Sequence, residues 1–93
     1  MDPALLPELQ AAIEEIGHRR FGTAPAVAEA KKRARGALVR FGQQPLPVTV
    51  REAATFLGYR LEDIQAHQPA LDWEPLLHAL QELEHEIARA SRT

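Results

Sequence analysis

An all-α fold, a compact bundle of four to five helices, is predicted by three features of the sequence. Apolar residues recur at three- and four-residue steps in several stretches, which is the spacing of one helical face. No stretch has the alternation and turn spacing of a sheet, and no winged β-hairpin fits after His67. The chain has 93 residues, 45% of them hydrophobic, so we expect one domain over residues 1–93.

Charge and composition narrow the classes of function. A net charge of −2 gives no overall attraction for nucleic acid. However, residues 19–60 hold most of the lysines and arginines, and residues 61–93 hold mostly acids, so a basic centre precedes an acidic end. The chain has no cysteine, which excludes disulfides and thiolate chemistry. No membrane span or signal peptide is recognisable, so we expect a cytoplasmic protein with no membrane partner.

The first two predicted helices cover residues 1–20 and residues 25–42. In the first, Gly17 is expected to end the helix. Its apolar face consists of Leu6, Leu9, Ile13 and Ile16. In the second, Thr23 or Ala24 precedes the helix and Pro25 occupies its first turn. Its buried stripe consists of Val27, Ala30, Ala34, Ala37, Leu38 and Phe41. The lysines and arginines of this basic helix are spread over its remaining surface.

Residues 49–68 are interpreted as a helix-turn-helix. Thr49 is a plausible N-cap, and Glu52 completes a capping box. Gly58 is expected to end a first short helix in a tight turn with positive φ, and residues 60–67 form the second helix. Ala54, Gly58 and Ile64 stand at the spacing of a DNA-reading motif, although glycine turns also join helices in other proteins.

The last predicted helix covers residues 72–90. Asp72 can cap its start, and Pro75 lies in its first turn. Four residues at heptad-like steps predict a seam between two copies of the chain: Leu76, Leu80, Leu83 and Ile87.

A DNA-binding interpretation gives these residues roles. On the second helix of the motif, Arg60 would contact guanine or phosphate, Gln65 adenine, and Glu62 cytosine. Leu61 and Gln68 lie on the same outward side, and Thr49 marks the start of the motif. Phosphate contacts would come from Lys31, Lys32, Arg35 and Arg51.

Residues Ala28 to Ile87 resemble the small helix-turn-helix domains of transposon- and plasmid-borne accessory proteins, of the KfrA-like and TetR-like class. The stretches that carry the resemblance are AEAKKRARGALVRFGQQ, PVTVREAATFLGY, the Ile and His that follow Gly58, and PLLHALQELEHEI. The resemblance implies a regulator or accessory factor that binds double-stranded DNA as a homodimer.

Other classes remain open at this point. The same scaffold suits a protein–protein interaction module, for example a phage or mobile-element modulator of a host complex, which would present Glu62 and Asp63 or the leucine-rich last helix. His78, Glu82 and His85 share one side of the last helix and could bind zinc, but we predict no metal and no cofactor. Catalytic motifs are lacking, so we do not expect an enzyme.

Overall fold

The computed structural model describes residues 4–66 and 71–92. This part of the chain contains four helices and no strand. The helices are α1 (Leu5–Arg19), α2 (Ala24–Gly42), α3 (Val48–Asp63) and α4 (Trp73–Ser91). The predicted all-α bundle is therefore confirmed.

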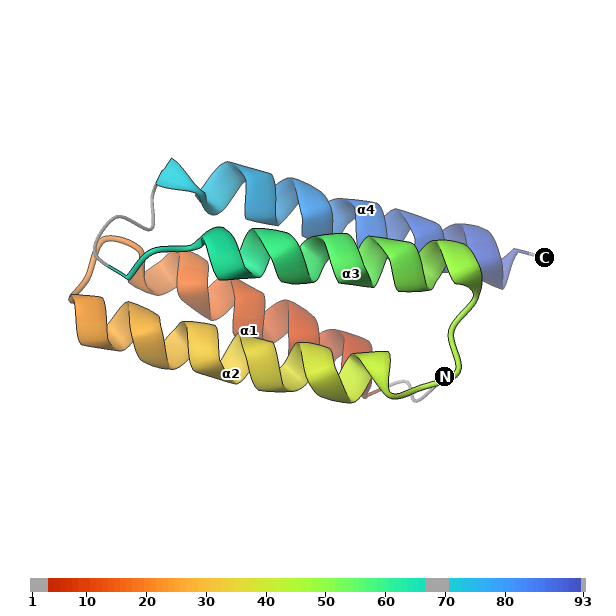
Figure 1. Ribbon diagram of the computed structural model, residues 1–93, viewed down its shortest axis with the longest axis horizontal. Coiled ribbons are helices and arrows are strands. Elements are labelled where there is room, and N and C mark those ends of the chain that lie inside the picture. The colour runs from red at the N-terminus through yellow and green to blue at the C-terminus, as the bar shows by residue number, and fades with distance from the viewer. Residues whose placement is uncertain (1–3, 67–70, 93) are drawn as a thin grey trace.

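Each helix runs antiparallel to the one before it (Figure 1). α1 packs mainly on α2, and α3 packs mainly on α4. The bundle is elongated along the helices, with extents of 43 × 20 × 17 Å. Two helical hairpins thus lie against each other, which leaves open grooves between neighbouring helices.

The core consists of the apolar stripes that the helical periodicity predicts. Side chains that are at most 3% exposed come from all four helices. They include Leu9, Ile13, Ile16, Val27, Ala30, Ala34, Ala37, Phe41, Leu57, Leu61, Leu76, Leu80 and Leu83. The buried alanines of α2 have small side chains, which suits close packing against neighbouring helices.

Two predicted N-caps, Thr23 and Asp72, are correct in position, but only Thr23 makes a capping hydrogen bond. Thr23 is the N-cap of α2, and its hydroxyl accepts a hydrogen bond from the Ala26 amide at 3.4 Å, with Pro25 in the first turn. Asp72 is the N-cap of α4, without a side-chain bond. The capping box at Thr49 is wrong, because α3 begins two residues earlier than predicted, with Pro47 as its N-cap. Thr49 therefore lies inside the first turn, where it cannot act as a cap.

The turn predicted at Gly58 is also wrong. α3 continues through Gly58 to Asp63, and no glycine among the described residues has a positive φ. A single buried stripe explains this, because Ala54, Leu57 and Leu61 follow helical spacing across the glycine. Burial of that stripe outweighs the cost of about 1 kcal/mol for glycine in a helix. The expected second helix is therefore the end of α3.

Gly17 lies inside α1, so the predicted helix end at this residue is wrong. A Cβ atom here would lie 2.6 Å from two ring atoms of Trp73. The missing side chain lets the indole at the start of α4 pack directly on the backbone of α1. The Arg20 guanidinium covers the same ring, 5.3 Å from its centroid.

Candidate functional site

Two cations predicted to contact DNA phosphates hold the end of α3 instead. Lys31 Nζ donates to the backbone oxygens of Glu62 at 3.1 Å and Ile64 at 2.8 Å. This charge suits the negative end of the helix dipole. Arg35, one turn along α2, donates to both carboxylate oxygens of Glu62, at 2.7 and 3.0 Å. Both side chains therefore have a structural role between α2 and α3.

The ion pair between Arg35 and Glu62 shifts both pKa values. The hydrogen bond from Arg35, with the charges of Arg35 and Lys31, lowers the pKa of the Glu62 carboxyl from its ordinary value of 4.5, against desolvation. The same hydrogen bond, together with the negative charge of Glu62, raises the pKa of Arg35. Both side chains are about half exposed, so water and salt weaken the pair. The predicted acceptor for cytosine is thus already occupied by an internal cation.

The two remaining arginines of the DNA interpretation also have internal partners. Arg51 donates to the backbone oxygens of Gly42 at 3.3 Å and Gln44 at 2.9 Å, and so braces the loop before α3. Arg60 pairs with Asp63 at 3.4 Å. Its guanidinium also lies 4.8 Å from the centroid of the Phe56 ring.

The other residues predicted to contact DNA differ in their exposure to solvent. Leu61 is 1% exposed and belongs to the core, so its predicted base contact is wrong. Thr49 and Gln65 are exposed. Gln68 lies outside the described residues. Lys32 is exposed and is the one cation of α2 without a hydrogen bond or ion pair in the described part of the chain.

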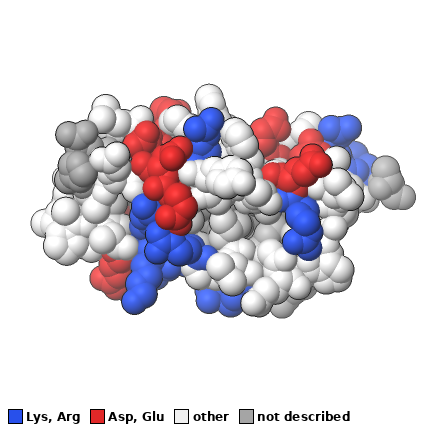
Figure 2. Space-filling view, in the orientation of Figure 1, with Lys and Arg blue, Asp and Glu red and all other residues white. Residues whose placement is uncertain are grey.

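These cations do not gather on one face. Lys32 lines the α1–α2 groove, of about 570 Å³, and Arg51 lines the α2–α3 groove, of about 250 Å³. Arg60 lines the α3–α4 groove, of about 420 Å³. Figure 2 shows basic and acidic atoms interleaved on the face that α2 and α3 form, without a continuous basic strip. This distribution differs from the single basic surface that a phosphate backbone requires.

The residues of the predicted dimer seam lie inside the bundle. Leu76, Leu80 and Leu83 are at most 3% exposed and pack in the core of the single chain, with Ile87 partly buried beside them. They contact the other helices of the same molecule, so a seam through them would require the bundle to open. Dimerisation itself stays a prediction.

The outer side of α3 exposes three large apolar side chains, which we call the α3 ridge: Val48, Phe56 and Tyr59. Phe56 is 50% exposed and Tyr59 is 66% exposed. Ile64, by contrast, is 1% exposed and belongs to the core. The sequence did hold a signal, because both aromatic residues fall outside the Ala54–Leu57–Leu61 stripe. The turn predicted at Gly58 divides that stripe between two helices, so the exposed side of one continuous helix is not recognised from the sequence.

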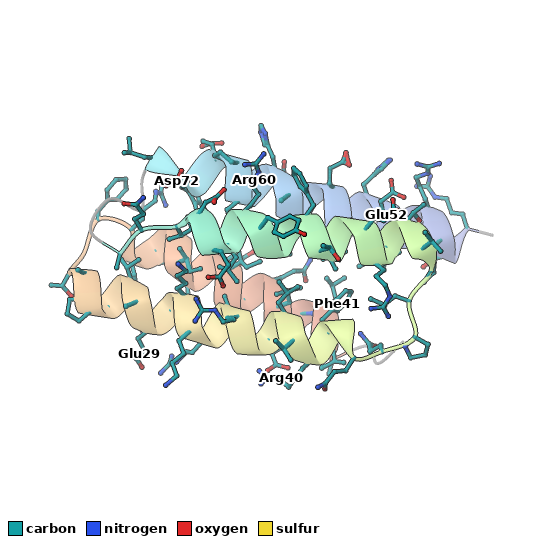
Figure 3. All side chains as sticks on the ribbon, in the orientation of Figure 1. Glu29, Arg40, Phe41, Glu52, Arg60 and Asp72 are labelled. Carbon is teal, nitrogen blue, oxygen red and sulfur yellow. The ribbon has the colours of Figure 1, made fainter. Side chains whose placement is uncertain are left out.

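Beside the ridge lies the α3–α4 groove. Phe56 from α3 and Pro75 and Ala79 from α4 provide its apolar surface. Polar groups line it as well: Arg60, Glu74, His78 and Glu82. Figure 3 shows Arg60 and Glu52 along the edge where α3 meets α4, away from Glu29 and Arg40 on α2.

Acidic groups without partners concentrate near this edge. Half of the carboxylates of the described residues form an ion pair, such as Glu8 with Arg40 and Glu29 with Arg33. The carboxylates that have no ion pair or hydrogen bond within residues 4–66 and 71–92 are Glu14, Glu52, Asp72, Glu74 and Glu82. All but Glu14 belong to α3 or to the start and first half of α4.

In residues 4–66 and 71–92, no group of three histidine or acidic side chains could hold a metal ion, and His78, Glu82 and His85 do not form one. Within the same ranges, no helix has both the length and the apolar content needed to cross a membrane. No known protein family, curated protein or solved structure matches this chain.

Proposed function

We propose that this protein is a helical protein–protein interaction module that binds its partner through the α3 ridge. The observation that carries the proposal is the exposure of Phe56 and Tyr59, at 50% and 66%, on the outward side of one helix. Aromatic side chains are enriched at the centres of protein interfaces, because they bury a large area with few rotatable bonds. Their exposure on a chain this small favours a partner that covers them.

The internal use of the cations supports the same choice over DNA. Lys31, Arg35 and Arg51 bind carbonyl or carboxylate groups of their own chain. A phosphate backbone would have to compete with these bonds and would meet the free carboxylates of α4. DNA binding remains a prediction, and it is the alternative that the experiment must separate from protein binding.

A photo-crosslinking residue placed at Tyr59 tests the proposal in the cells that make the protein. Its matched control is the same residue at Glu14, which is exposed on α1 and has no partner among the described side chains. We expect a discrete protein adduct from position 59 and none from position 14. Fluorescence anisotropy with duplex DNA at low salt is the parallel measurement, and we expect no saturable binding.

Two results would overturn the proposal. One is the absence of any protein adduct from position 59, with the variant folded as judged by circular dichroism. The other is salt-sensitive duplex binding that is weakened by Lys32→Ala, because that lysine has no structural partner among the described residues and would act only on the ligand.

A further inference from the structure

The geometry of the α3–α4 groove points to one kind of partner: we propose that the groove receives a cationic amphipathic helix of another protein. This inference rests on the proposed function, because it names the partner's chemistry and places it beside the α3 ridge.

The apolar surface of the groove provides a contact area for the hydrophobic side chains of the partner. Phe56, Pro75 and Ala79 all line a groove of about 420 Å³. Phe56 is 50% exposed and Pro75 is exposed, whereas Ala79 is 3% exposed, so a visiting apolar side chain would contact mainly Phe56 and Pro75. Helix-in-groove recognition uses this combination, with apolar anchors at helical spacing entering a hydrophobic furrow.

The charges around the groove select a cationic partner. Glu74 and Glu82 line it, and neither has a hydrogen bond or ion pair among the described residues. Arg60 is the one lining cation, and Asp63 already pairs with it. Glu52 lies one turn before Phe56 on α3, also without a partner in the described ranges. Complementary charge at an interface rim directs partner choice and increases the association rate.

The spacing of the two carboxylates defines the partner further. Glu74 and Glu82 are eight residues apart on α4, which is about 12 Å along the helix axis. A helix lying along the groove would match them with lysines or arginines seven or eight residues apart, along one flank of an apolar stripe.

The other two grooves lack this combination. In the α1–α2 groove the carboxylates of Glu8 and Glu29 are bound by Arg40 and Arg33. The α2–α3 groove is smaller, about 250 Å³, and its cation Arg51 is bound to backbone oxygens. Of these three grooves among the described residues, the α3–α4 groove is the one that joins an exposed aromatic ring to carboxylates without partners.

The experiment uses the whole chain and a fluorescent Leu/Lys peptide as the probe. The peptide has about 18 residues, enough to follow the groove as a helix for roughly 27 Å, and a Leu/Glu peptide of the same pattern is its control. Anisotropy titrations compare Glu74→Gln and Glu82→Gln with Glu14→Gln, which removes the same charge from the surface of α1. Phe56→Ala tests the apolar contact.

We expect each groove variant to weaken binding about two- to fivefold, the effect of one exposed ion pair. We expect Phe56→Ala to weaken it about tenfold. Glu14→Gln should change it by less than about twofold, because its charge lies on another helix. The Leu/Glu peptide should not bind.

Equal weakening by all three Glu→Gln variants, or no binding of the Leu/Lys peptide, would overturn the inference. So would self-association of the chain, measured by light scattering, that Phe56→Ala abolishes. A Tyr59 adduct combined with indifference to Glu74 and Glu82 would reject the groove and leave the proposed function standing. Loss of the Tyr59 adduct would reject the proposed function itself.

Discussion

Gly17→Ala should destabilise the bundle by forcing Trp73 away from α1. The added methyl group would lie 2.6 Å from Cη2 and Cζ2 of the indole and 3.3 Å from Cε2, well inside van der Waals contact. Overpacking of this kind costs about 1–3 kcal/mol. The better helix propensity of alanine returns about 1 kcal/mol. A net loss of about 1 kcal/mol is therefore expected, which lowers Tm by about 4–8 °C in a domain of this size.

Thermal and urea denaturation of four proteins tests this reasoning: the parent, Gly17→Ala, Trp73→Leu and the double variant. Without the indole, the clash disappears, so Gly17→Ala should then stabilise the protein by its propensity alone, about 1 kcal/mol. Gly42→Ala is the matched control, because a Cβ at that position meets nothing within 4 Å. Stabilisation by Gly17→Ala with Trp73 present would refute the proposed contact.

Two further predictions concern the end of α3. Because Arg35 lowers the pKa of the Glu62 carboxyl from 4.5, the parent should exceed Glu62→Gln in stability above that pH, by no more than about 0.5 kcal/mol for an exposed pair. The difference should vanish as the pH falls below 4.5 through the lowered pKa, and urea titrations over this range that show a constant difference would contradict it. Lys31→Ala should cost about 1 kcal/mol, because two carbonyls at the end of α3 lose their cation. Lys32→Ala should cost less than about 0.5 kcal/mol, and equal losses in urea denaturation would exclude a special role for Lys31.

The fold class and the core could be predicted because they depend on periodicity, which is local information. Leu9, Ile13 and Ile16 are fully buried as the three- and four-residue steps require. Thr23 likewise caps α2 as its position before Pro25 predicts.

The error at Gly58 has a physical cause. Glycine favours turns because it tolerates positive φ, but its cost inside a helix is only about 1 kcal/mol. A stripe from Val50 to Leu61 that is buried against the rest of the bundle outweighs this cost. Whether residue 58 lies in a helix or in a turn therefore depends on tertiary packing, and a local sequence motif carries no information about that packing.

The candidate site was harder to predict for the same reason. Arg35 and Glu62 are far apart in sequence, so their ion pair appears only when α2 and α3 are placed side by side. From the sequence alone, Arg35 is one cation of a basic centre that is free to contact phosphate, and Glu62 is a side chain predicted to contact a base. The exposure of Phe56 and Tyr59 became visible only once α3 was known to be one continuous helix.

The most direct test of this account is the stability of Gly58→Ala, since the α3 ridge exists only if α3 runs unbroken through this residue. A Cβ at position 58 would make an ordinary contact with Cδ2 of Leu38, at 3.4 Å. An unbroken helix therefore predicts that alanine raises the free energy of unfolding by about 0.5–1 kcal/mol, measured by urea denaturation. A loss of about 1 kcal/mol or more would indicate a turn with positive φ at Gly58, and would contradict the continuous helix and the surface built on it.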